Sequence, residues 1–104
     1  MERIVIAAYK PFPGKEKELK ELMNNHLTIL RNENLVSYRD SIIMEAKDGT
    51  VLEVFGWKSK EAIESAHNNE MVRKMWDEYA RVCEFIPFGN IAESRDLFSE
   101  FSPL

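Results

Sequence analysis

Cysteine is almost absent from this sequence: Cys83 is the only one among 104 residues. A single cysteine cannot form a disulfide within the chain, and this pattern is typical of proteins in a reducing compartment. The first residues lead directly into a short apolar segment and do not resemble a signal peptide. No apolar run approaches the roughly 20 residues that a membrane-spanning helix needs. We therefore expect a cytoplasmic protein that is not inserted in a membrane.

The sequence also lacks an excess of basic residues. It has 14 Lys and Arg against 18 Asp and Glu, a formal net charge of −4. Proteins that bind nucleic acids neutralise phosphates with Lys and Arg, and no basic cluster with interleaved aromatic residues occurs here. We therefore expect no nucleic-acid partner. The hydrophobic content of 44% and the length favour one globular domain over residues 1–104.

Glycine is scarce, and its four occurrences are isolated from one another. A glycine-rich phosphate-binding loop is therefore missing, as is any flavin or nicotinamide motif. No serine lies in a nucleophile elbow. Cys83 has only Arg81 as a basic neighbour in sequence, so we interpret it as a buried structural thiol. These absences predict a protein that works without a cofactor and without a metal.

Hydrophobic spacing predicts six regular elements in the order β-α-β-β-α-β. The expected strands span residues 3–9, 35–46, 51–57 and 85–93, and the expected helical regions span 15–32 and 59–82 with a break at 68–69. Asp48-Gly49 favours a tight hairpin, and Ser59 is a plausible helix N-cap. This order is that of the α+β, ferredoxin-like plan, in which helices cover one face of a four-stranded antiparallel sheet.

The expected strands are apolar on both faces. In the first strand Ile4 and Ile6 point to one face while Val5 and Ala7 point to the other. Helices on one side cannot bury both faces, and an exposed apolar sheet would form a large adhesive patch. We therefore expect a homodimer in which two sheets pack face to face. The apolar tail from about residue 94 is expected to pack on the partner subunit.

Two histidines are candidates for chemistry. His26 lies on or beside the apolar stripe of the first helix, where it could act as a general base or be a partly buried, hydrogen-bonded residue. His67 ends the first half of the second helical region. Its spacing from Glu64 and Glu70 is found in metal sites only when several such pairs converge, so a solvated helix end is the alternative.

Aromatic residues supply further candidates. Trp57 ends the third strand, and Trp76 falls on the last helix. Such residues are often part of the core, but they would also suit the walls of a flat cavity for a planar aromatic ligand. Tyr38 and Asn90 are the polar candidates to orient such a ligand. We include His67 among the residues expected to contact it.

Three motifs resemble those of the antibiotic biosynthesis monooxygenase-like family, within the dimeric α/β-barrel superfamily. They are Tyr9 followed by Pro13-Gly14-Lys15, the run from Phe55 to Ala62, and the closing Phe85-Ile86-Pro87-Phe88 with Glu93, Phe98 and Phe101. The resemblance covers nearly the whole chain. It implies two sheets packed face to face, with a pocket in each subunit between sheet and helices. Some members oxygenate quinol-like or polycyclic aromatic substrates without a cofactor, whereas others degrade heme or isomerise small lactones.

The heme-degrading members can be compared position by position. They use an asparagine on the first strand, a tryptophan early in the second helical region and a histidine further along it. Alignment on Gly14 and on Trp57 places Ala7, Ala66 and Trp76 at those three positions. Without the histidine the chain has no axial ligand for iron. We therefore do not expect heme degradation.

The resemblance thus implies a cofactor-independent monooxygenase acting on a quinol-like or small aromatic substrate. Such a reaction needs a base, an apolar site and a donor for the developing anion. We expect His26 to be the base, Trp57 and Trp76 to be walls, and Tyr38 or Asn90 to be the donor. A ligand-binding or regulatory dimer of the same fold, without catalysis, is the alternative.

Overall fold

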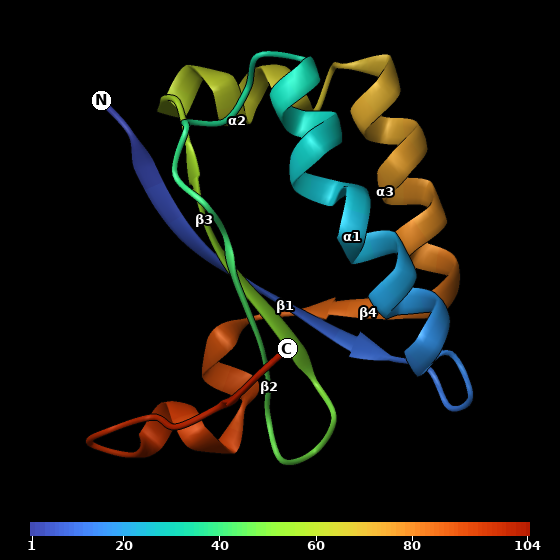
Figure 1. Cartoon of the computed structure of the whole chain (residues 1–104), viewed down its shortest axis with the longest axis vertical. Coiled ribbons are helices and arrows are strands. Elements are labelled where there is room, and N and C mark those ends of the chain that lie inside the picture. Colours follow the sequence, from blue (N-terminus) through green and yellow to red (C-terminus); the bar gives the residue numbers. More distant parts are fainter.

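The computed structural model describes residues 1–104 and shows an α+β fold with five antiparallel strands and three α-helices (Figure 1). The strands are β1 (Arg3–Pro11), β2 (Ile42–Glu45), β3 (Val51–Trp57), β4 (Cys83–Ile86) and β5 (Ser102–Pro103). The helices are α1 (Glu16–Asn32), α2 (Lys60–Ala66) and α3 (Glu70–Val82), followed by the 3-10 helices η1 (Phe88–Asn90) and η2 (Ala92–Arg95). The strand order β4-β1-β3-β2-β5 is consistent with a ferredoxin-like fold that has gained one edge strand.

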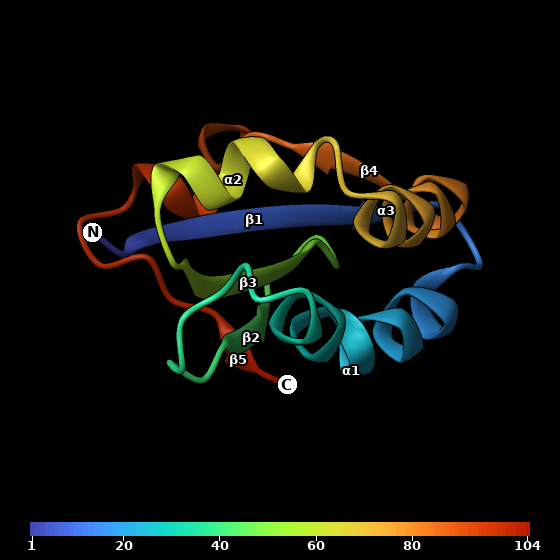
Figure 2. The ribbon, with the colours of Figure 1, turned by 90° about the horizontal axis from the view of Figure 1, so that it is seen from above.

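Helices α1 and α3 pack side by side on one face of the sheet (Figures 1 and 2). Alternation along β3 turns Val51, Phe55 and Trp57 toward these helices, where they form the main core. Each long helix presents one buried stripe at helical spacing. The stripes are Leu19, Met23, His26 and Leu30 on α1, and Val72, Met75, Tyr79 and Val82 on α3.

The other face of the sheet is covered over only part of its area. The segment after β4 lies against one end, where Ile91 packs with Ala8 and Leu52. Toward the other end Ile4, Ile6 and Ile42 keep 56%, 46% and 61% of their surface exposed. Ile6 on β1 and Ile42 on β2 are both cross-strand neighbours of Val54 on β3, so they flank it in one continuous patch. We call Ile4, Ile6, Ile42 and Val54 the open sheet face.

The helix cap predicted at Ser59 is present, and a second side-chain cap lies at Asn69. The Ser59 hydroxyl accepts a hydrogen bond from the Ala62 amide at the start of α2. The Asn69 side chain does the same for the Val72 amide at the start of α3. Each cap satisfies an amide that has no partner within its helix. The hairpin after β2 also forms as expected, with Gly49 at a positive φ of 92°.

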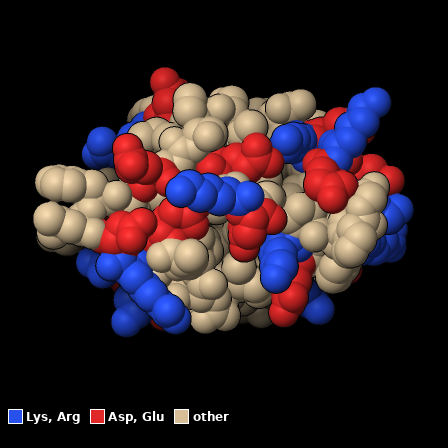
Figure 3. All heavy atoms as spheres, turned by 90° about the horizontal axis from the view of Figure 1, so that it is seen from below, with Lys and Arg blue, Asp and Glu red and all other residues tan.

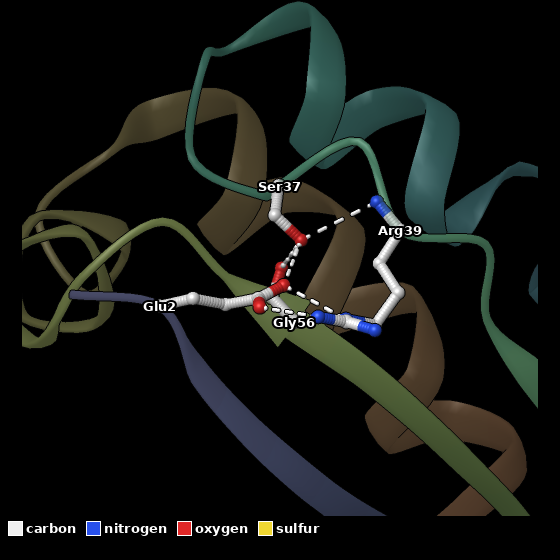
Figure 4. A network of polar contacts seen from close by, with 4 residues as sticks. All are labelled: Glu2, Ser37, Arg39 and Gly56. Atoms are coloured by element: carbon white, nitrogen blue, oxygen red, sulfur yellow. Dashed lines mark hydrogen bonds and ion pairs between the residues drawn. The ribbon is translucent and has the colours of Figure 1, made fainter.

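The long second strand expected over residues 35–46 is wrong in extent. Only Ile42–Glu45 pairs as a strand, and Val36 forms a single bridge with Trp57. Between them the chain leaves the sheet edge, and the side chains of Ser37 and Arg39 reach the Glu2 carboxylate (Figure 4). The segment between Val36 and Ile42 is therefore held away from the sheet by polar contacts, which hydrophobic spacing does not reveal.

The Glu2 network joins this loop to the beginning of β1. Arg39 donates to both carboxylate oxygens, at 2.8 Å from Nη2 and 3.1 Å from Nε, and Ser37 also donates to Glu2. These hydrogen bonds from Arg39 and Ser37 lower the pKa of Glu2 from 4.5 to about 2. A Cβ atom at Gly56 would collide with the Glu2 carboxylate and lie 2.7 Å from Ser37 Oγ. Glycine at position 56 therefore makes room for the network.

The C-terminal part departs from the expected fourth strand over 85–93. Strand β4 ends at Ile86, and the chain turns at Pro87 into η1 and η2, because proline offers no amide to continue the ladder. Glu93 is buried there and accepts from the Lys47 amide at 2.9 Å, which ties this segment to the β2–β3 hairpin. The last residues then add β5 to the edge of the chain's own β2. Packing of this tail on a partner stays a prediction.

Acidic and basic side chains are interspersed on the end of the molecule shown in Figure 3, and neither sign forms a continuous patch there. A uniform basic surface, which a polyanion would require, does not occur on this end. None of the helices is both long and apolar enough to cross a bilayer.

Candidate active site

An apolar cavity of about 370 Å³ lies mainly on the helix-covered side of the sheet, and Ile6 of the open sheet face also borders it. It is lined by residues of β1, α1, β3, α3 and β4, namely Val5, Ile6, Ala7, Tyr9, His26, Phe55, Trp57, Trp76 and Phe85. Its size and its lining, with very few polar groups, are those of a site for a small organic molecule. A hollow of about 450 Å³ beside α1 and α3 is lined mainly by charged and polar side chains, so it is a weaker candidate.

Two ionisable side chains are buried beside the apolar cavity. His26 comes from the buried stripe of α1 and is 2% exposed, and Glu53 comes from the middle of β3 and is fully buried. His26 Nδ1 lies 2.7 Å from Glu53 Oε1. The contact has ion-pair length, although the oxygen lies off the line of a well-formed N–H···O bond. A carboxylate in such a place needs a partner, because an unpaired buried charge is very costly.

Tyr9 is the third polar residue of this group. Its hydroxyl donates to the same oxygen, Glu53 Oε1, at 3.4 Å. Burial and the nearby Glu53 charge raise the pKa of Tyr9 well above its ordinary value. Tyr9 packs edge-on to Phe85 and against Tyr79, with ring centroids 5.7 and 5.3 Å apart. The ring is therefore held firmly while its hydroxyl remains a proton donor.

Besides His26 Nδ1, two polar atoms in this region have no hydrogen-bond partner in the protein. They are Glu53 Oε2 and the hydroxyl of Tyr79, a side chain that is fully buried. Burial, together with the charge on Glu53, raises the pKa of Tyr79. Cys83 is buried, as expected, and its thiol donates to the Tyr79 carbonyl at 3.2 Å. Burial also raises the pKa of Cys83 to about 11, which suits a structural thiol and not a nucleophile.

The arrangement is that of a general base held by a carboxylate. With Nδ1 turned to Glu53, the other ring nitrogen of His26 is left for a ligand in the cavity that the side chain lines. A buried carboxylate beside one nitrogen fixes the orientation of the ring and stabilises the imidazolium that forms when the other nitrogen takes a proton. Such a pair beside an apolar cavity can remove a proton from a bound hydroxyl group.

The structure brings together only some of the residues predicted from the sequence. His26, Trp57 and Trp76 all line the cavity. His67 is exposed, with Nδ1 2.9 Å from the Ile63 carbonyl and its ring 5.3 Å from that of Trp76. His67 therefore packs against Trp76, a wall of the cavity, from outside the cavity.

Tyr38 and Asn90 do not line the cavity. Tyr38 is 92% exposed because it lies in the loop where the second strand is interrupted. Asn90 is exposed in η1, on the segment that covers the opposite face of the sheet beyond Pro87. Neither residue lies beside His26 in the cavity lining.

Sequence reasoning missed Tyr9, Glu53, Phe55 and Phe85 as site residues. Glu53 could have been found, because a single acidic residue in the apolar run Val51–Trp57 is unusual for a buried strand. Its place opposite Ala7 and Ile43 leaves it covered on both sides. Nothing in the local sequence distinguishes Tyr9 from an ordinary core tyrosine.

Comparison with known proteins shows the fold. No family model matches the sequence, and no curated protein matches it. Among solved structures, the chain is similar to the structure of Rv0793 from Mycobacterium tuberculosis, with 18% sequence identity and a TM-score of 0.66. The similarity covers 83% of this chain and 89% of Rv0793. At that identity it establishes a shared architecture and carries no information on activity.

Proposed function

We propose that the protein is a cofactor-independent monooxygenase, of the antibiotic biosynthesis monooxygenase-like family, that oxidises a small quinol-like aromatic substrate. The observation that carries this proposal is the buried pair of His26 and Glu53 at the wall of an otherwise apolar cavity. The fold shared with Rv0793 is compatible with the family resemblance seen in the sequence.

The reaction begins with removal of a proton from a phenolic hydroxyl by His26. Glu53 stabilises the resulting imidazolium, and the substrate becomes an electron-rich phenolate. The phenolate then reduces molecular oxygen, so that the substrate itself supplies the electrons. One oxygen atom becomes a new carbonyl on a ring carbon that loses its hydrogen, and the other oxygen atom leaves as water. The product is a quinone.

The cavity walls support this chemistry. Trp57, Phe55 and Trp76 provide flat apolar surfaces on which an aromatic ring can pack. An apolar site also accommodates molecular oxygen and strengthens the electrostatic effect of the few polar groups that it contains.

We further propose that two copies associate through the open sheet face, which leaves each cavity on the outside of the sheet pair. Three exposed isoleucines on that face support this assembly. The single unpaired cysteine favours the cytoplasm as its location.

Oxygen uptake with a panel of quinols and small phenols tests the activity. We expect consumption of one molecule of oxygen per molecule of quinone formed. The His26→Ala variant should lose about a hundredfold or more in kcat, because general base catalysis typically contributes that much. The Glu53→Gln variant should show a comparable loss, because the histidine is no longer oriented and stabilised by a charge.

His67→Ala is the matched control, since it removes an exposed histidine outside the cavity. It should leave kcat within about twofold. Unaltered turnover in His26→Ala would contradict the proposal that His26 is the general base. The alternative, a ligand-binding or regulatory dimer, predicts quenching of Trp57 and Trp76 fluorescence by phenols with no oxygen uptake.

A further inference from the structure

We infer that Tyr9 is a second substrate-binding residue, whose hydroxyl turns from Glu53 to donate a hydrogen bond to a second oxygen atom of the ligand. The site then takes aromatic compounds that carry two oxygen functions. This inference rests on the proposed function only in placing an aromatic ligand beside His26.

The hydrogen bond that Tyr9 makes in the free protein is easily given up. Its length of 3.4 Å is beyond the usual range for an O–H···O bond. The accepting atom, Glu53 Oε1, is already approached by His26 at 2.7 Å, while Oε2 has no partner. Two polar groups therefore lie against one oxygen, and the more distant Tyr9 hydroxyl loses little when it changes to another acceptor.

The position of Tyr9 suits a contact with the ligand. Tyr9 lines the cavity, whereas the equally buried Tyr79 does not. Packing against Tyr79 and Phe85 fixes the Tyr9 ring, so only the hydroxyl hydrogen needs to rotate. Because its pKa is raised, the hydroxyl stays protonated and acts as a donor throughout the neutral range.

The shared acceptor also brings the two groups together. The Tyr9 hydroxyl and His26 Nδ1 both lie near the same atom of Glu53, so these two atoms can be no farther apart than those two contact distances combined. They therefore occupy one side of the cavity, and the remaining walls are apolar. A ligand that satisfies both groups carries two oxygen functions.

An anaerobic NMR titration with three probes tests the inference. Catechol has adjacent oxygens, hydroquinone has opposed oxygens, and phenol has one. We expect the wild-type protein to bind catechol about five- to tenfold more tightly than phenol, which is the value of one additional hydrogen bond. Hydroquinone also carries a second oxygen and should likewise bind more tightly than phenol. This comparison needs no variant, so it does not depend on the folding of one.

The Tyr9→Phe variant should lose the preference for catechol and keep its affinity for phenol within about twofold. Tyr79→Phe is the matched control, because it removes a buried hydroxyl outside the cavity lining, and it should keep the preference. Equal binding of the three probes by the wild type, failure of all three to bind, or a catechol preference that survives in Tyr9→Phe would overturn the inference. Oxygen uptake is measured separately, so a protein that prefers catechol without consuming oxygen would refute the oxygenase and leave the role of Tyr9 intact.

Discussion

Two carboxylates of this chain are held in opposite environments. Glu53 is fully buried and has His26 and Tyr9 as its only polar partners. Glu2 lies near the surface, where Arg39 binds both of its oxygens. Glu53 therefore acts on a neighbouring side chain in the cavity, whereas Glu2 fastens a loop to the sheet.

The Glu2 network makes part of the stability depend on pH. Because the folded pKa of about 2 lies below the ordinary value of 4.5, folding favours the ionised carboxyl group. The stabilisation is complete above about pH 4.5 and is lost as the pH falls toward 2. We expect thermal unfolding midpoints of the wild type and of Glu2→Gln to differ at neutral pH and to converge across this window.

Salt provides the control for that measurement. The ion pair between Glu2 and Arg39 is exposed, so added salt should reduce the difference between wild type and Glu2→Gln. A difference that stays constant from neutral pH to pH 2 would show that the network does not contribute through the charge on Glu2.

The residues of the candidate site could be predicted from the sequence only in part. His26 and Trp76 occupy helices whose periodicity fixes which side faces the sheet, and both line the cavity. Tyr38 and Asn90 were predicted from strands that the chain interrupts, so they lie elsewhere. The pairing of Tyr9 with Glu53 joins residues 44 positions apart, and no local pattern indicates it.

At the scale of elements, the best predictions came from local chemistry. The helices and β3 follow hydrophobic spacing, and the caps follow the preference of serine and asparagine for the first turn. The second and fourth strands were predicted too long, because their ends depend on tertiary contacts such as the Glu2 network and the burial of Glu93. Strand β5 was not predicted, since two paired residues leave no periodic pattern.

The Asn69 cap of α3 has a measurable effect on stability. Its side chain accepts from the Val72 amide at 3.1 Å and also donates to Glu33 at 3.0 Å, which links α3 to the end of α1. Asn69→Ala should lower the free energy of unfolding by about 1 to 2 kcal/mol, as other N-cap replacements do. Urea denaturation measures this loss. The neighbouring exposed Asn68 makes no side-chain hydrogen bond, so Asn68→Ala should change stability by less than about 0.5 kcal/mol.

At the scale of the whole molecule, the two faces of the sheet are covered to different extents. One is sealed by α1 and α3, and the other is sealed only where the segment after Pro87 crosses it. The exposed isoleucines of the open sheet face lie on β1 and β2, on either side of Val54 on β3. A monomer would leave this apolar surface in water, whereas a symmetric pair would bury it against its own copy.

Light scattering on two matched variants tests this association. Ile42→Lys places a charge in the proposed interface, whereas Met71→Lys places the same charge on α3, where Met71 is 53% exposed on the helical side. We expect wild type and Met71→Lys to have the mass of a dimer at micromolar concentration and Ile42→Lys to have that of a monomer. A buried, unpaired charge strongly opposes association, so the shift should be complete. A wild-type monomer, or a dimer that survives Ile42→Lys, would show that the open sheet face does not join two copies.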